Sequence, residues 1–211
     1  TFHQPSLVIS DINFLKTLPK REIICGYGEI LKHALISDKK FFLFLNKNAD
    51  RIINLEIPFI QKAIKESCLI KKLIVQKDEK EKNLRKILNF GHTFAHAYEA
   101  SLKYSKKLNH GEAVLLGIAS ASKFSLNNKL LTRKEFNLVK NHLINFNLPV
   151  NLKKFFTVRD VKKILSFIEK DKKNTDDKIN LVLLKTIGNP IYNLKFNYKK
   201  LYYFLKKELI N

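Results

Sequence analysis

Apolar residues recur at three- and four-residue spacing along most of the chain, from about Arg21 onward. Residues three and four apart share one face of a helix, so this spacing is typical of amphipathic helices. It predicts helices over residues 22–35, 39–45 and 57–75, and further helices that begin near His92, His110, Thr132 and Thr157. The buried side of the 57–75 helix is expected to consist of Ile60, Ala63, Ile64, Cys68, Leu69 and Leu73. The chain should therefore be mainly α-helical.

The pattern changes near the C-terminal end. Residues 179–184 predict a strand, residues 188–190 a turn and residues 198–210 a closing amphipathic helix. Two of the helix starts carry capping patterns, which are Thr132 with Glu135 and Thr157 with Asp160. We therefore expect an all-helical domain with a short β-hairpin near the C-terminus.

Residues 1–20 differ from the rest of the chain. Residues 6–11 are typical of a short strand that leads into a turn, and Pro5 and Pro19 lie on either side of it. The sequence has no Met, including at position 1. We therefore expect residues 1–20 to be the last part of a preceding domain and residues 21–211 to form the helical domain.

The chain is strongly basic, with 40 Lys+Arg against 19 Asp+Glu and a net charge of +21 over 211 residues. A nucleic-acid-binding helical domain is one interpretation, because clustered cations bind phosphates. Only five of the basic residues are arginines, and the lysines are spread through every segment, which favours a lysine-rich surface instead. Such a surface would still attract small anionic substrates.

Hydrophobic residues make up 45% of the chain, which is enough to bury a core. No stretch approaches the roughly 18 uncharged apolar residues of a membrane-spanning helix. Its two cysteines, Cys25 and Cys68, do not indicate a disulfide framework, which agrees with a reducing cytoplasm. We therefore expect a cytoplasmic protein that binds neither membranes nor nucleic acid.

Several histidines and glutamates are spaced as metal ligands could be. His92 and His96 are four residues apart, so a helix would place both imidazoles on one face. A catalytic zinc ion takes three ligands of the His or Glu type, and the candidates are Glu29, His92, His96, Glu99 and His110. Helix-face histidines with ordinary hydrogen bonds are the alternative. A zinc metalloprotease helix is excluded, because Thr93 stands where the general-base glutamate would follow His92.

A second group of polar residues precedes these histidines and consists of Lys71, Glu81, Arg85 and Asn89. Glu81 and Arg85 are four residues apart, and so are Arg85 and Asn89. One interpretation is a surface salt bridge, which stabilises a helix by only a few tenths of a kcal/mol. The other is a cation that binds a carboxylate or phosphate beside an acid placed for proton transfer. The spacing leaves both interpretations open.

Taken in order, these segments resemble the 3-dehydroquinate synthase family. The most specific match is the stretch from Asn89 to Thr93 with His110-Gly-Glu112 downstream. The other matching segments are residues 2–5, 14–19, 21–22, 28–32, 71, 78–85, 171–173, 181–184 and 187–188. The resemblance covers essentially the whole chain. It implies the C-terminal helical domain of a two-domain enzyme, with residues 1–20 left from an N-terminal α/β domain that binds NAD.

The resemblance also implies roles for individual residues. The metal ligands would be Glu29, His92 and His110. The catalytic residues would be Lys32, Glu81 and His96, of which Glu81 and His96 transfer protons. The substrate carboxylate would be bound by Lys71 and Arg85, its hydroxyls by Lys32, and its phosphate by Asn89, His96 and one of Lys172 and Lys173, with Lys173 preferred. The residues that contact NAD would be Phe14, Leu15, Lys16 and Thr17.

The implied activity is that of a lyase of the shikimate pathway of aromatic amino acid biosynthesis, which converts 3-deoxy-D-arabino-heptulosonate 7-phosphate into 3-dehydroquinate and phosphate. Its implied cofactors are NAD and a zinc or cobalt ion, and the full-length enzyme would be a homodimer. We expect residues 1–211 alone to be inactive, to bind zinc weakly and to bind NAD hardly at all. The alternative is another sugar-phosphate cyclase of the same superfamily, although the pair of Lys71 and Arg85 suits an acid substrate.

Three positions depart from the family's common pattern. Gly26 stands where Ala is common, and Ala95 stands where Gly is frequent and adds a methyl group to a helix contact. Asn83 also replaces a frequent Gly. Since Asn tolerates a left-handed backbone better than most residues, we expect that conformation at Asn83.

Overall fold

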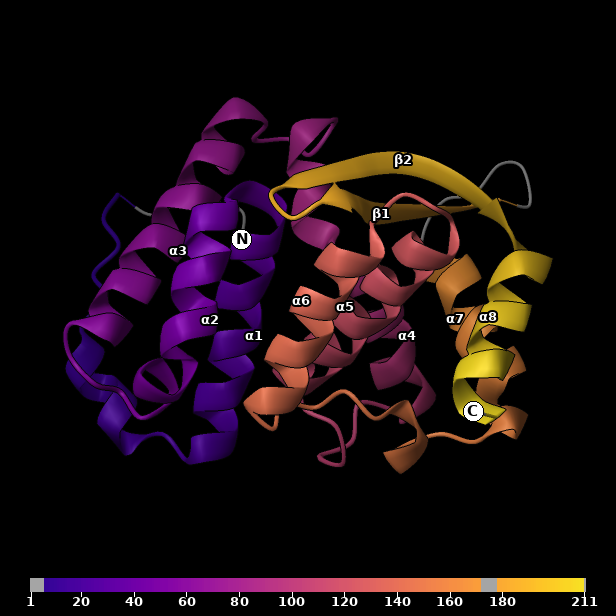
Figure 1. Cartoon of the computed structure of the whole chain (residues 1–211), viewed down its shortest axis with the longest axis horizontal. Helices are drawn as coiled ribbons and strands as arrows, with labels where there is room; N and C mark the ends of the chain where they lie inside the picture. Colours follow the sequence, from indigo (N-terminus) through magenta and orange to yellow (C-terminus); the bar gives the residue numbers. More distant parts are fainter. Residues whose placement is uncertain (1–5, 172–177, 211) are drawn as a thin grey trace.

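The computed structural model describes residues 6–171 and 178–210 (Figure 1). Over these residues the helices are α1 (Lys20–Ser37), α2 (Lys39–Ile53), α3 (Phe59–Lys77), α4 (His92–Ser101), α5 (His110–Asn127), α6 (Arg133–Asn145), α7 (Val161–Asp171) and α8 (Tyr198–Ile210). Short 3-10 helices span Ile12–Thr17, Leu84–Asn89, Leu152–Lys154 and Val158–Asp160. The strands are β1 (Lys178–Thr186) and β2 (Asn189–Asn197). The expected helical fold with a C-terminal hairpin is confirmed.

The helices lie in three groups along the long axis of the molecule (Figure 1). α1, α2 and α3 form one end, α4, α5 and α6 the middle, and α7 and α8 the other end. α5 packs against both α1 and α4, and α4 packs against α7, so one continuous apolar core links the groups. Within the described ranges, no helix is long and apolar enough to cross a membrane.

The hairpin runs over the helices from the α1 end toward α8 (Figure 1). Its strands are antiparallel, with Leu181 opposite Leu194 and Thr186 opposite Asn189. β1 is longer than the predicted 179–184 and packs its buried side chains against α5. The turn docks on α1, because the N–H of Gly188, whose φ is +86°, donates to the carbonyl oxygen of Leu35 at 2.8 Å.

Glycines let the central helices approach closely. A Cβ at Gly111 in α5 would overlap the backbone of Cys25 in α1. A Cβ at Gly117 in α5 would overlap the carbonyl oxygen of Gly91, which precedes α4. Since any larger residue would push these helices apart, the two glycines set the separation of α1, α4 and α5.

Two expectations were wrong. Residues 6–11 form no strand, because no described segment pairs with them, and their apolar side chains lie exposed. On α3, Cys68, Leu69 and Leu73 are exposed instead of buried. The buried stripe of α3 runs through Ile60, Ala63, Ser67, Ile70 and Ile74. Hydrophobic periodicity assigned the buried face of α3 wrongly, because the buried stripe contains the polar Ser67 while the exposed face carries Leu69 and Leu73.

The capping patterns were right about the positions of the helix starts. The Thr157 N–H donates to the Asp160 carboxylate at 2.8 Å, and a 3-10 turn there leads into α7. The Thr132 hydroxyl accepts the Glu135 N–H at 3.3 Å before α6. The Glu135 carboxylate does not return to Thr132 but binds Lys39 and the N–H of Ile187, which fastens the hairpin turn to α6.

Candidate functional site

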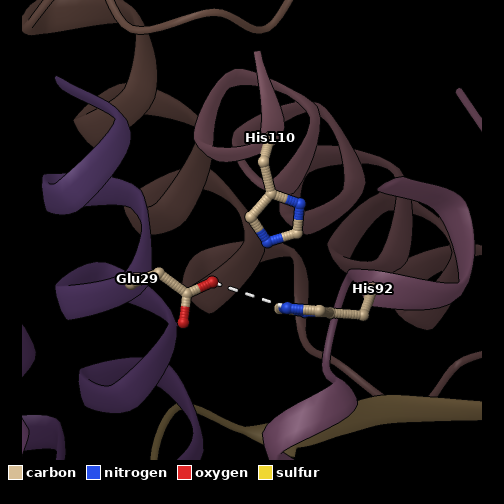
Figure 2. A group of neighbouring side chains, drawn as sticks. All are labelled: Glu29, His92 and His110. Atoms are coloured by element: carbon tan, nitrogen blue, oxygen red, sulfur yellow. Dashed lines mark ion pairs between the residues drawn. The ribbon is translucent and has the colours of Figure 1, made fainter. Parts of the chain in front are cut away.

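Three side chains from separate helices meet at one point. Glu29 lies in the middle of α1, whereas His92 and His110 are the first residues of α4 and α5. Each offers one ligand atom, and these atoms lie within 4.8 Å of one another (Figure 2). The Nε2 of His92 is 3.5 Å from the Oε1 of Glu29. The close crossings of α5 with α1 and α4 therefore bring together residues that are up to 81 positions apart in sequence.

The starts of α4 and α5 are held in place by local structure. Gly91 has a φ of +79°, and a Cβ there would lie 2.8 Å from the N of Ile118, so the backbone needs glycine immediately before His92. At the start of α5, the Glu112 carboxylate accepts the N–H of Asn109 at 2.8 Å. These two features fix the backbone positions of His92 and His110, and therefore the points from which their imidazoles extend.

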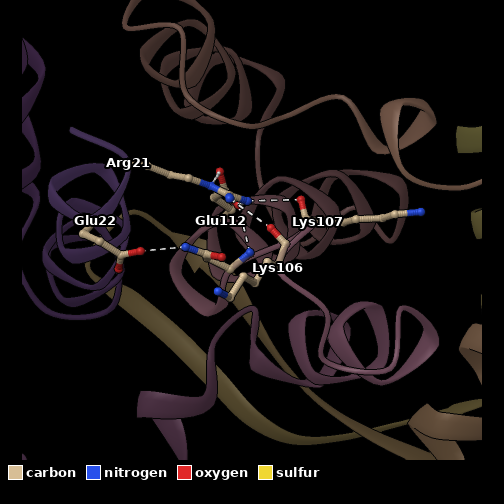
Figure 3. A network of polar contacts seen from close by, with 6 residues as sticks. Arg21, Glu22, Lys106, Lys107 and Glu112 are labelled. Carbon is tan, nitrogen blue, oxygen red and sulfur yellow. Dashed lines mark hydrogen bonds and ion pairs between the residues drawn. The ribbon is translucent and has the colours of Figure 1, made fainter. Parts of the chain in front are cut away.

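Arg21 connects the start of α1 to the start of α5 (Figure 3). Its guanidinium binds both carboxylate oxygens of Glu112, at 2.8 Å and 2.6 Å. It also donates to the carbonyl oxygens of Lys106 and Lys107, in the loop that precedes His110. A bidentate contact of this kind restrains orientation as well as distance, so it holds that loop against α1.

The ligand atoms of Glu29 and His92 have the charge and protonation states that suit a bound cation. Burial favours the neutral form of Glu29, but the nearby Lys32 ammonium outweighs it, so the pKa of Glu29 is lowered and the carboxylate is charged at neutral pH. Burial, reinforced by Lys32, lowers the pKa of His92 to about 4, so this imidazole is neutral. The Nδ1 of His92 faces the carbonyl oxygen of Phe90 at 3.4 Å, which leaves Nε2 unprotonated toward Glu29.

One oxygen of Glu29 lacks a donor. Its Oε2 accepts from the Nζ of Lys32 at 2.7 Å, whereas its Oε1 is buried and has no hydrogen-bond partner among the described residues. A buried carboxylate oxygen without a donor is costly unless a cation binds it. A set of one carboxylate and two imidazoles suits zinc or cobalt, so the residues present fit a metal of this class.

A cavity of about 230 Å³ opens beside these three residues. It is lined by Glu29, Lys32, His33, Lys71, Glu81, Arg85, Leu88, Asn89, His92 and His110. The structure therefore gathers in one cavity all the predicted metal ligands and all the predicted substrate-binding residues except His96 and Lys173. The cationic side chains in its wall suit an anionic ligand.

The segment between α3 and the Leu84–Asn89 helix is organised by Asp78. Its carboxylate accepts the N–H groups of Lys82, Asn83 and Arg85 at 2.9, 2.7 and 3.0 Å. The backbone N–H groups of Arg85, Asn83 and Lys82 thereby lower the pKa of Asp78. The carboxylate thus ties together the loop that carries Glu81.

The surface salt bridge considered between Glu81 and Arg85 is absent from the described structure. The Arg85 guanidinium donates to the carbonyl oxygen of Glu79 at 2.5 Å, and Glu81 accepts from the Nδ2 of Asn89 at 2.6 Å. The helical spacing misled because residues 78–83 form a loop. The prediction of a left-handed backbone at Asn83 was also wrong, since its φ is −137°. In this loop Glu81 adopts that conformation instead, with a φ of +53°.

His96 lies one turn after His92 on α4. Its ring centroid is 5.3 Å from that of His92 and 6.1 Å from that of His110. A second group of possible ligands, His96, Glu99 and His110, also has its ligand atoms within 4.8 Å of one another. Every candidate ligand found in the sequence therefore lies in this one region.

The remaining predicted residues lie elsewhere. Phe14, Leu15, Lys16 and Thr17 belong to the Ile12–Thr17 helix on the surface, and none of them lines the 230 Å³ cavity. Leu15 instead lines a separate apolar cavity of about 280 Å³ between α1 and α3. Lys172 and Lys173 lie outside the described residues.

Sequence reasoning missed His33. This residue is buried, its Nδ1 lies 2.7 Å from the hydroxyl of Ser67, and it lines the cavity. Burial, reinforced by Lys32, lowers its pKa to about 4. The polar Ser67 within an otherwise apolar helix stripe was the only signal for this pair.

Comparison with known proteins gives consistent matches. The family model described as 3-dehydroquinate synthase C-terminal matches residues 26–174. The 3-dehydroquinate synthase of Pelagibacter ubique is 64% identical over 209 residues, which cover 99% of this chain and 57% of the relative. That of Thermodesulfovibrio yellowstonii is 41% identical over 197 residues, which cover 93% of this chain and 54% of the relative. The chain thus spans little more than half the length of these relatives.

Solved structures share the fold. ValA, a 2-epi-5-epi-valiolone synthase from Streptomyces hygroscopicus with NAD+ and Zn2+ bound, matches with a TM-score of 0.86 and 25% identity, over 99% of this chain and 57% of that one. A 2-deoxy-scyllo-inosose synthase complexed with carbaglucose-6-phosphate, NAD+ and Co2+ matches with a TM-score of 0.74 and 22% identity, over 93% and 55%. The family-model match and the identity to the curated relatives show that the chain belongs to the 3-dehydroquinate synthase C-terminal family.

Proposed function

We propose that the chain is the metal- and substrate-binding part of a 3-dehydroquinate synthase, a lyase that converts 3-deoxy-D-arabino-heptulosonate 7-phosphate into 3-dehydroquinate and phosphate. The observation that carries this proposal is the meeting of Glu29, His92 and His110 at the edge of a cavity lined by cationic side chains. Family membership supports it, because the curated relatives bear this name.

Glu29, His92 and His110 would hold a zinc or cobalt ion. When bound, such an ion polarises a carbon–oxygen bond and stabilises negative charge that develops on the oxygen. Lys32, which is buried against Glu29, would also hydrogen-bond the hydroxyls at the reacting carbons. The pKa of Lys32 is lowered by burial, an effect that Glu29 partly offsets.

The other lining residues would bind and orient the substrate. Lys71 and Arg85 would bind its carboxylate, while Asn89, His96 and Lys173 would bind its phosphate. Glu81, held by Asn89 at 2.6 Å, and His96 would transfer protons. Holding both anionic ends of the substrate fixes the reacting carbons and reduces the entropy that must be lost in the transition state.

NAD would act as a hydride acceptor that is restored within each cycle. We assign its contacts in this chain to Phe14, Leu15, Lys16 and Thr17. The structural match to ValA, solved with NAD+ and Zn2+ bound, supports both cofactors. We also propose a cytoplasmic homodimer for the complete enzyme.

The experiment is a chimera in which these 211 residues replace the corresponding part of the Pelagibacter ubique enzyme, to which they are 64% identical. We expect it to release phosphate from 3-deoxy-D-arabino-heptulosonate 7-phosphate when NAD and zinc are supplied, and the His110→Ala chimera to lose this activity. A folded chimera without activity, or one that His110→Ala leaves unaffected, would contradict the proposal.

A related sugar-phosphate cyclase is the second candidate, favoured by the match to ValA. Lys71 and Arg85 separate the two, because a pair of cations at the cavity wall is useful for a substrate with a carboxylate. We expect Arg85→Ala in the chimera to raise KM for the acid at least tenfold with a smaller effect on kcat. An unchanged KM, together with turnover of a phosphorylated sugar that lacks the carboxylate, would favour the second candidate.

A further inference from the structure

Glu99 is a buried carboxylate directed at one of the three ligand-type residues. It lies two turns after His92 on α4, and its side chain is 11% exposed. Its Oε2 is 3.0 Å from the Nδ1 of His110, the first residue of α5. A buried carboxylate is costly unless it is paired, so this contact accounts for its burial in the described structure.

The contact determines which nitrogen of His110 is free. Because the carboxylate is an acceptor, Nδ1 must carry the proton, and the lone pair of the neutral imidazole is then on Nε2. Figure 2 shows the second ring nitrogen of His110 directed into the space between Glu29 and His92. Without a partner on Nδ1, the ring could take the other tautomer, in which a proton would occupy that space.

His110 has need of such a restraint. Its side chain is 52% exposed and stands at a helix start, so few neighbours limit its rotation. His92, by contrast, is 12% exposed and has the Phe90 carbonyl oxygen beside its Nδ1. The two imidazoles are therefore held by different means, one by backbone and burial and the other by a charged side chain.

We propose that Glu99 is a positioning residue that fixes the tautomer and rotamer of His110 so that Nε2 faces the metal position. This inference rests on the proposed metal centre. A carboxylate on the far nitrogen of a ligating histidine also raises the basicity of that ligand, and removing such a partner commonly weakens metal binding 10- to 100-fold.

Glu99 could instead be a ligand itself, since His96, Glu99 and His110 form a second possible group. In that arrangement a cation would take the place of the Nδ1 proton of His110. Wild-type protein would then bind a second metal ion that the Glu99 variants lose. Metal stoichiometry separates this arrangement from the proposed one.

The first test is the tautomer of His110 in the metal-free chain, read from two-bond 1H–15N correlation spectra at a pH where the imidazole is neutral. We expect the Nδ1–H form in wild type and in Glu99→Gln, whose amide oxygen still accepts. Glu99→Ala should move His110 toward the Nε2–H form. An unchanged tautomer in Glu99→Ala would overturn the proposal.

The second test is the affinity for Zn2+ by chelator competition. We expect Glu99→Ala to weaken it 10- to 100-fold and Glu99→Gln to weaken it less. Glu208→Gln is the matched control, because Glu208 is a half-buried carboxylate in a separate cavity lined by residues of α5 and α6. This substitution should leave the affinity for Zn2+ unchanged. Unchanged affinity in Glu99→Ala, or two ions in wild type and one in the variant, would overturn the proposal. If His110→Ala also left zinc binding unchanged, the metal centre itself would be wrong.

Discussion

Replacing Gly111 by Ala should separate two of the helices that carry the ligand-type residues. A Cβ at this position would overlap the Cα and Cβ of Cys25, and both of those atoms belong to the α1 backbone or are fixed to it. No rotamer change can remove this overlap, so α1 and α5 must move apart. Helix propensity alone would favour Ala by up to about 1 kcal/mol, whereas overpacking costs typically 1–3 kcal/mol or more.

We therefore expect Gly111→Ala to lower the free energy of unfolding by about 1–3 kcal/mol, measured by urea denaturation. It should also weaken cobalt binding, because Glu29 lies on α1 and His110 on α5. Gly26→Ala is the matched control in α1, since nothing lies within 4 Å of the added Cβ. That change should raise stability by about 0.5–1 kcal/mol. A Gly111→Ala chain as stable as wild type would refute the close crossing of the two helices.

Three further predictions concern His142, Arg21 and NAD. Burial lowers the pKa of His142 to about 4, so the unfolded chain binds this proton more readily below pH 6.5. His142 alone should contribute roughly 2 kcal/mol to the fall in stability between pH 7.5 and 5, and His142→Gln should remove that part of the slope in urea titrations, while His33 and His92, whose pKa values are also lowered to about 4, maintain the remainder. Arg21→Met should weaken zinc binding several-fold without unfolding the chain, because it frees the loop before His110. Calorimetric titration of zinc at constant pH checks this prediction, and an unchanged affinity would contradict it. Equilibrium dialysis should find little NAD bound to residues 1–211, and tight stoichiometric binding would overturn that expectation.

The sequence was most informative where structure is local. Three- and four-residue periodicity located the helices, and the Thr157–Asp160 pattern located a helix start. The same rule failed on α3, because the inward stripe passes through Ser67, whose hydroxyl pairs with buried His33. Residues 6–11 failed for a different reason, since a strand needs a partner and the described residues supply none.

The candidate site was harder to predict from the spacing of residues along the chain. Spacing alone would place His92 and His96 together on a metal, whereas the resemblance selected Glu29, His92 and His110, which come from three helices. These residues come together because α5 crosses α1 and α4 closely at Gly111 and Gly117, and hydrophobic periodicity does not show where helices cross. The role inferred for Glu99 could not have been read from the sequence either, because its partner lies on another helix.

The central claim is that Glu29, His92 and His110 together bind one divalent metal ion. A Co2+ titration of the chain, followed by visible absorption, tests it most directly when repeated with Glu29→Gln, His92→Ala and His110→Ala. We predict one weak saturable site in wild type and loss of its absorption bands in each variant, while Glu208→Gln retains them. Absorption bands that persist in all three variants, or that are absent from folded wild-type protein at millimolar Co2+, would contradict the account.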